Sequence, residues 1–394
     1  MKLSKLSFAV AVAAAGIAGA AQADGTAPAG PTLADVLGNS GITVSGVVDA
    51  GYTYQQGNLT TNGFNGNDKS SFNFKQAELT VAKQPTEGFG GLVNITAGRD
   101  AGFIRSYPYA ATANSNVSNG FAGSTGQDFD VTQAYVQYAS GKLTAILGKY
   151  ATLVGAEVIN PASNTNITRS IGFYFGPYTH TGARVTYAAN SQLSLIAGLN
   201  NGWDQQESAN GSSKTVELGV ALNPSDKVSW LTQSYIGDAS YNGGNFPGVG
   251  AGGVSNRTIV DSVLTVKPTA KLSLVADGTY GHQAGADGNA AYSWNILAGY
   301  VNYQWTDMWR TSLRLETFSD PSGIKLASLT PTGAPVKRRN EATFTVGYAP
   351  TAHVELRGEL RNDWASKKFD TETDSTTASK TNYMTAAFEA LYKF

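Results

Sequence analysis

The sequence lacks cysteine and is poor in histidine, methionine and charge. Its 394 residues include no Cys, three His and three Met, and only 14% are charged. Without thiols the chain can form no disulfide and use no cysteine nucleophile, which excludes disulfide-stapled modules and thiol enzymes. His180, His282 and His353 are the only imidazoles available for acid–base or metal chemistry.

The sequence also lacks a long hydrophobic run beyond its first 20 residues, and its mean hydropathy is −0.19. Lys2 and Lys5 precede an apolar run from Leu6 to Ala20, and small residues follow at 21–23, a pattern typical of a cleaved secretory signal peptide. The run is short for an uncleaved anchor, which needs roughly 20 apolar residues. We therefore predict a signal peptide over residues 1–23.

The net charge of the chain does not indicate a nucleic-acid partner. Loss of the two signal-peptide lysines from a total of 28 basic residues leaves 26 against 29 acidic residues, a formal charge of −3. A charge this small does not favour nucleic acid as a partner.

What the chain has in abundance is glycine, aromatic residues and period-two alternation, with 45 Gly, 19 Tyr, 16 Phe and 6 Trp. In the segment 353–364 an uncharged row of Val354, Leu356, Gly358 and Leu360 alternates with a charged row, as expected for a strand with two different faces. Similar segments predict about 16 strands. Their ranges are 42–55, 71–83, 89–99, 129–139, 142–150, 178–188, 192–200, 214–222, 227–236, 257–267, 271–281, 292–304, 308–318, 340–349, 353–364 and 381–394.

The connections between these strands alternate in length. Short turns rich in Pro, Asn, Ser and Gly, such as 139–142 and 223–226, alternate with long polar connections. The long ones include 100–128, 151–177, 237–256, 319–339 and 365–380. Short turns on one rim and long loops on the other are typical of outer-membrane barrels, and the last predicted strand is amphipathic and ends on Phe394.

We therefore predict an all-β fold, a transmembrane antiparallel β-barrel over residues 42–394 with short periplasmic turns and long extracellular loops. Residues 24–41 are expected to form a periplasmic N-terminal lead-in, and the expected location is the bacterial outer membrane. A soluble sandwich with one solvated face explains any single strand equally well. It does not explain the signal peptide, the rim asymmetry and the C-terminal Phe394 together.

Several segments resemble the OmpL-like putative beta-barrel porin family. They are Ala145-Ile-Leu-Gly-Lys-Tyr150, Gly155-Ala-Glu-Val-Ile159, Asn164 to Ser170, Pro177 to Arg184 and Leu199-Asn-Asn-Gly-Trp-Asp204. The similarity is densest over 143–204 and continues more weakly toward the C-terminus. The resemblance implies an outer-membrane porin. It supports the predicted fold and location more strongly than it indicates which solute is transported.

Sixteen strands are enough to enclose an aqueous channel, so passive diffusion of small polar solutes or ions is the expected function. We hypothesise that the third long loop, 151–177, folds inward to form a constriction through Glu157, Asn160, Asn164 and Arg169. It would face charged rows on the barrel wall, and opposed charges across a pore create a transverse field. The residues of these rows are Arg310, Arg314, Glu316, Glu355, Arg357, Glu359 and Arg361. Ordinary lumen wall with paired charges, each pair worth about 0–1 kcal/mol, is an alternative of nearly equal weight.

Two other functions stay open. A barrel whose long loops bind a partner would serve as an adhesin or structural protein. A hydrolase could pair His180 with Ser170, but no nucleophile-elbow motif accompanies them, so we expect no enzyme.

The remaining expectations concern partners. The expected partners are outer-membrane lipid and small polar solutes or ions, and a homotrimer is compatible with the sequence. We expect no cofactor and no metal, and the loop carboxylates Asp370, Glu372 and Asp374 are expected to be solvated.

Overall fold

The computed structural model describes residues 40–56, 70–104, 106, 129–207, 214–238, 256–285, 290–327, 336–371 and 378–394. The predicted signal peptide and nearly all of the lead-in lie outside these residues, so both stay predictions. Within the described ranges, no helix has the length and apolar character needed to cross a membrane.

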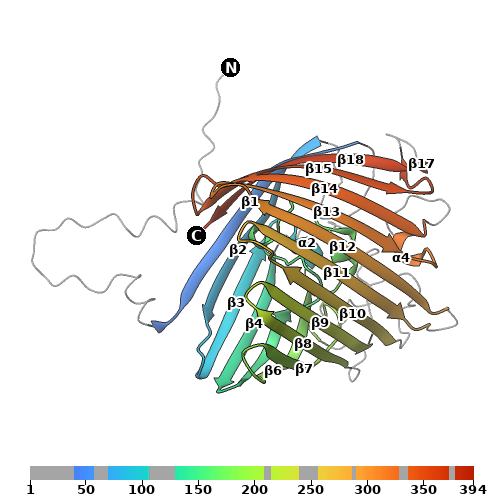
Figure 1. Cartoon of the computed structure of the whole chain (residues 1–394). Helices are drawn as coiled ribbons and strands as arrows, with labels where there is room; N and C mark the ends of the chain where they lie inside the picture. The colour runs from blue at the N-terminus through green and yellow to red at the C-terminus, as the bar shows by residue number, and fades with distance from the viewer. Residues whose placement is uncertain are drawn as a thin grey trace, which may run out of the picture. The chain divides into compact units, whose positions relative to one another are not determined.

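The described residues form a closed barrel of sixteen antiparallel strands in which each strand pairs with its sequence neighbour (Figure 1). This confirms the predicted fold class. The strands of the barrel are β1 (Thr43–Gln55), β2 (Ser70–Lys83), β3 (Gly88–Ala97), β4 (Phe129–Ser140), β5 (Leu143–Ala151), β6 (Thr179–Ala188), β7 (Leu193–Asn200), β8 (Thr215–Ser225), β9 (Val228–Asp238), β10 (Asn256–Val266), β11 (Leu272–Gln283), β12 (Tyr292–Gln304), β13 (Trp309–Ser319), β14 (Arg338–Tyr348), β15 (Val354–Ala365) and β18 (Asn382–Lys393).

The predicted strand ranges agree with these bounds to within a few residues. Short elements in the connections were not predicted. They are α2 (Ala101–Ile104), the 3₁₀ helix η2 (Pro161–Ser163), α3 (Ile171–Phe175), α4 (Ile324–Ala327) and a separate two-stranded sheet of β16 (Asp370–Thr371) and β17 (Ala378–Lys380).

The barrel closes where β1, in blue, lies beside β18, in red (Figure 1). The two strands pair from Val47 with Lys393 to Gln55 with Thr385. The chain end completes the seam, because the Gly46 nitrogen donates to the Phe394 carbonyl at 2.9 Å and the Phe394 nitrogen donates back at 3.1 Å. The terminal aromatic residue is thus part of the seam.

The two faces of the wall follow the predicted alternation. On β15 the apolar Leu360 is 56% exposed on the outer face, whereas Arg361 is 1% exposed on the inner face. The rows on β10 and β13 divide in the same way, with Leu264 and Leu315 outside and Asp261 and Arg314 inside. Because an Arg or Lys facing lipid at mid-depth costs about 2–4 kcal/mol, the charged rows must lie inside.

Candidate functional site

The connection from β5 to β6, residues 152–178, reaches the inward-facing side chains of the opposite wall, and we call it the inner loop. The Gly155 nitrogen donates to Asp261 Oδ1 on β10 at 2.8 Å, and the Ala156 nitrogen donates to Asp277 Oδ2 on β11 at 2.8 Å. In the strand order of the barrel, β10 lies five strands from β5. The loop therefore crosses the barrel interior.

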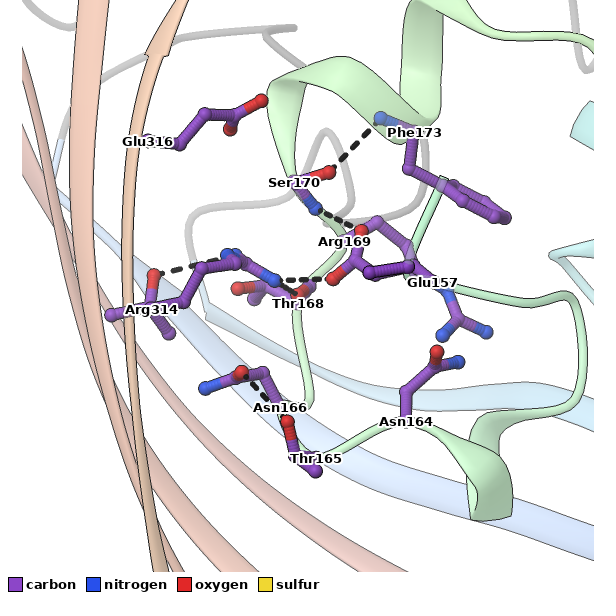
Figure 2. A network of polar contacts seen from close by, with 12 residues as sticks. Glu157, Asn164, Thr165, Asn166, Thr168, Arg169, Ser170, Phe173, Arg314 and Glu316 are labelled. Carbon is purple, nitrogen blue, oxygen red and sulfur yellow. Dashed lines mark hydrogen bonds and ion pairs between the residues drawn. The ribbon is translucent and has the colours of Figure 1, made fainter. Parts of the chain in front are cut away.

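A buried ion pair joins the inner loop to β13. Arg314 Nη1 lies 2.5 Å from Glu157 Oε1, and Arg314 Nε lies 2.5 Å from Glu341 Oε1 on β14. The same guanidinium donates to the Thr168 carbonyl at 2.7 Å, so it holds two points of the loop (Figure 2). Glu157 is itself held from inside the loop, because the Ser170 nitrogen donates to its Oε2 at 2.8 Å.

Glu359 on β15 accepts hydrogen bonds from the loop backbone. It accepts from the Ile167 nitrogen at 2.6 Å, and from the Thr168 nitrogen and hydroxyl at 2.9 Å and 2.6 Å. Bonds of this kind to an ionised acceptor are stronger than neutral ones. Glu359 thus holds the middle of the loop against β15.

Glu316 on β13 performs the same task at the start of α3. It accepts from the Ile171 nitrogen at 2.7 Å and the Gly172 nitrogen at 2.6 Å, and the Ser170 hydroxyl caps the helix by accepting from the Phe173 nitrogen at 2.9 Å. Both Arg314 and Glu316 extend from β13 toward the loop in Figure 2. The first N–H groups of a helix lack partners within it, so a carboxylate and a serine cap are fitting acceptors there.

Besides Arg314, three further arginines of the wall donate to carbonyl groups of the inner loop. Arg310 reaches the Thr165 carbonyl at 2.8 Å, Arg357 the Pro161 carbonyl at 3.1 Å and Arg361 the Arg169 carbonyl at 2.6 Å. The remaining predicted wall residue, Glu355, pairs with two of these arginines, Arg310 at 2.6 Å and Arg357 at 2.9 Å. All seven predicted wall residues therefore hold the loop directly or hold a residue that does.

The other predicted loop residues shape the loop itself. Asn160 caps η2 by accepting from the Ala162 nitrogen at 2.9 Å, and its amide donates to Glu78 on β2 at 3.1 Å. Asn164 exchanges two hydrogen bonds with the backbone of Val158 at 2.7 Å and 2.9 Å. Arg169 donates to the Ile159 carbonyl at 2.7 Å.

This geometry differs from the predicted one in one respect. The hypothesis placed loop and wall charges on opposite sides of a water-filled gap, whereas Glu157 and Arg314 are in direct contact. The physical reason is that the wall arginines and glutamates have more donors and acceptors than neighbouring strands satisfy, and the loop backbone supplies the missing partners. The action of these residues on a solute stays a prediction.

An apolar cluster inside the barrel was not predicted from the sequence. Phe175 of α3 packs on Phe318 of β13 with ring centroids 4.9 Å apart, and Trp294 and Ile296 of β12 belong to the same buried cluster. A signal was present in β12, where aromatic and aliphatic residues alternate with Ser293, Asn295 and Gly299. We expected apolar side chains on the lipid face, but on β12 most of the large ones point inward.

Asp100, beside α2, is a buried carboxyl close to the inner loop. Its side chain is 4% exposed, and burial raises the pKa of the Asp100 carboxyl to about 6, although the cations of Arg169 and Lys75 act in the opposite direction. A carboxyl held in this way is partly protonated in mildly acidic solution.

The candidate hydrolytic pair is not assembled. His180 is buried, stacks on Tyr235 with centroids 4.0 Å apart, and places its ring nitrogens 3.1 Å from the Gly202 carbonyl and 3.3 Å from the Thr152 hydroxyl. The hydroxyl of Ser170 caps α3 instead.

The described residues form no metal site, and little of the predicted loop carboxylates is described. Among the residues that the structure describes, no group of three or more His, Asp or Glu is arranged to hold a metal ion. Of the three loop carboxylates, Glu372 and Asp374 lie outside those residues, and of Asp370 only the backbone is described.

Comparison with known proteins points to one family. A family model described as putative beta-barrel porin-2, OmpL-like, matches residues 41–394. This agrees with the family that the sequence resembles. No curated protein matches the chain.

Several solved outer-membrane proteins have a similar fold. A loop-deletion mutant of OmpT from Vibrio cholerae is 10% identical, with 90% of this chain and 99% of that chain covered and a TM-score of 0.57. OprB from Pseudomonas putida is 13% identical over 91% and 96% of the two chains, with a TM-score of 0.56. An anion-selective porin from Comamonas acidovorans is 9% identical over 90% and 99%, also with a TM-score of 0.56. At these identities the similarity concerns the fold alone.

Proposed function

Because the chain belongs to the OmpL-like putative beta-barrel porin family, we propose that it forms a channel for passive diffusion of small polar solutes or ions across the outer membrane. The observation that carries this proposal is the inner loop, which crosses a sixteen-stranded barrel and is held on its wall by charged side chains. A barrel of this size is wide enough for an aqueous lumen, and an inward loop is a direct means of narrowing it.

In this proposal the inner loop determines the width of the channel. Glu157, Asn160, Asn164 and Arg169 keep the loop folded, and the charged rows of β13 and β15 keep it against the wall. Selectivity by size then depends on the loop, because the strands themselves form a rigid, fully hydrogen-bonded cylinder.

The test is single-channel recording of the refolded protein in a planar bilayer. A variant shortened between Gly155 and Arg169 should conduct more than the wild type in the same salt solution. Ser163→Ala, which alters an exposed side chain of the same loop, should leave conductance unchanged. Equal conductance of the shortened and wild-type proteins would contradict the proposal that the inner loop constricts the channel.

A second candidate function is a closed barrel that acts as a structural or adhesive protein through its long loops. The observation in its favour is the buried apolar cluster around α3, which fills part of the interior with Ile171, Tyr174 and Phe175. Absence of current from correctly folded protein, across a range of voltages, would favour this candidate over the channel.

We also propose a homotrimer. A solved structure of Vibrio cholerae OmpT, 10% identical with a TM-score of 0.57, is described as a trimer form. Light scattering of the protein in mild detergent would measure the mass of the complex, and a monomeric mass would contradict this proposal.

A further inference from the structure

A pocket of about 470 Å³ opens at the short-turn rim, directly beneath the inner loop. Its lining includes Thr165 of the loop and Arg310 of β13, which donates to the Thr165 carbonyl. Turn residues between β8 and β9 and between β10 and β11 also line the pocket, together with residues of β11 and β12. A solute that passes the inner loop on this side therefore meets this pocket next.

Three lysines line the pocket. Lys227, Lys267 and Lys271 lie at odd positions, in phase with the inward-facing residues of β9, β10 and β11. Their two turns are adjacent, because the Lys267 nitrogen donates to the Lys227 carbonyl at 2.7 Å. All three are exposed, and the Lys271 ammonium donates one hydrogen bond to the Trp305 carbonyl at 3.2 Å, which leaves two of its three N–H groups for a ligand.

The balance of charge in the pocket is positive. Asp226 is the one carboxylate among the described lining residues, against the three lysines. Arg310 contributes little net charge because it pairs with Glu355 at 2.6 Å. No ion pair found among the described residues includes any of the three lysines.

The lining also supplies neutral donors. They are Asn302 of β12 and Ser273 of β11, whereas the amide of Gln304, also in the lining, already donates to the carbonyls of Thr306 at 2.6 Å and Trp309 at 3.3 Å. Exposed ammonium groups beside amide and hydroxyl donors suit an oxyanion, which accepts hydrogen bonds and carries negative charge. The deep rows of β13 and β15 are different, because their charges already neutralise one another in ion pairs.

We propose that this pocket binds small oxyanions, such as phosphate or carboxylates, at the periplasmic mouth of the barrel and gives the channel a preference for anions. The anion preference rests on the proposed channel function, whereas oxyanion binding does not. Three like charges around the pocket raise the local concentration of anions, and salt screens this effect over about 10 Å at 0.1 M ionic strength.

Binding is tested without any current. Inorganic phosphate titrated into the folded protein in detergent, followed by calorimetry at low ionic strength, should give a saturable heat for the wild type. The triple variant Lys227→Glu, Lys267→Glu, Lys271→Glu should lose that heat. Succinate in place of phosphate separates a general oxyanion site from a phosphate-specific one. No saturable heat with either anion, or heat that persists in the triple variant, would refute the site.

Selectivity is tested by the reversal potential in a gradient of potassium chloride across a planar bilayer. We expect the wild type to favour chloride, and Lys267→Glu to lower the ratio of anion to cation permeability by about twofold or more at low ionic strength. Lys83→Glu is the matched control, because Lys83 is an exposed lysine near the same rim whose position at the end of β2 is in phase with the outward-facing residues.

The outcomes separate the two proposals. A conducting wild type without chloride preference, or equal effects of Lys267→Glu and Lys83→Glu, would overturn the anion preference and leave the channel in place. Absence of current from folded protein would overturn the channel and with it the preference, while the phosphate titration would still decide the binding site.

Discussion

At the scale of single residues, the charged rows illustrate what alternation can and cannot predict. The sequence placed Arg314 and Arg361 on the interior face because lipid would not tolerate them. It did not reveal that both side chains are fully buried, since their partners Glu157 and the Arg169 carbonyl come from a loop far away in sequence. The face of the strand on which a side chain lies depends on the local sequence, whereas the residue that it pairs with depends on the tertiary structure.

Arg314 provides a sharp test of this network. Arg314→Met keeps most of the side-chain volume but removes the cation that lies 2.5 Å from Glu157 and 2.5 Å from Glu341, and leaves Glu341 only the longer ion pair with Arg361 at 3.7 Å. We expect the free energy of unfolding to fall by about 3–5 kcal/mol, the usual loss when one partner of a buried ion pair is removed. Urea titration of the protein in lipid vesicles would measure it.

The matched control is Arg338→Met, because Arg338 is an exposed arginine on the neighbouring strand β14. Its effect should stay within about 0.5 kcal/mol, as for most surface substitutions. Similar losses for the two variants would mean that the contacts of Arg314 do not stabilise the barrel.

At the scale of elements, the strands were more predictable than the connections. Period two is visible along each strand, and turn residues mark the short rim. The helix α3 is only five residues long, and its start depends on Glu316, which is 145 residues away from Ile171 in sequence. Such a helix is stabilised mainly by its tertiary contacts, so local sequence does not predict it well.

The seam between β1 and β18 leaves little room for a larger residue at Gly46. A Cβ atom added at Gly46 would lie 2.3 Å from the Phe394 ring and 2.5 Å from the Glu78 carbonyl oxygen. We therefore expect Gly46→Ala to lower the yield of folded barrel, because the clash falls where the sheet must close. A folded barrel and the heat-unfolded protein differ in gel mobility. The fraction of protein whose mobility changes on heating would therefore measure this yield.

Gly278→Ala is the control for this variant. Gly278 lies on β11, and an added Cβ would meet no atom within 4 Å. The control should fold like the wild type, and a normal yield for Gly46→Ala would show that the seam can adjust to a larger residue.

At the scale of the whole molecule, the barrel has an apolar exterior and a mixed interior. Exposed residues such as Leu297, Leu315, Phe344 and Phe388 cover the outside of the wall. The interior contains both the charged network around Arg314 and the apolar cluster around Phe318. The apolar part of the interior was not predicted from the sequence, which indicated only the charged rows.

The exterior predicts where the membrane lies. Leu297 occupies the middle of β12 and is 61% exposed, whereas Met308 lies in the short turn before β13. We expect Leu297→Arg to cost about 2–4 kcal/mol of unfolding free energy in lipid and Met308→Arg about 0–1 kcal/mol, because the cost of a cation depends on its depth.

Equilibrium unfolding in vesicles, compared with unfolding in detergent, would test this. Equal costs at the two positions would contradict a membrane that spans the middle of the strands. A cost for Leu297→Arg that is the same in detergent as in lipid would point to packing rather than to depth.

The sequence by itself determined the class of fold, the sixteen strands and the facing of the charged rows, because an alternating pattern and turn chemistry act between near neighbours. The inward course of the loop was a hypothesis from the sequence, whereas tertiary structure alone decided which contacts hold it and that apolar side chains of β12 and α3 meet inside the barrel. These contacts join backbone N–H groups to carboxylates on distant strands. They come together only when the sheet closes, since any backbone group buried by closure must then find a partner among the side chains that the wall presents.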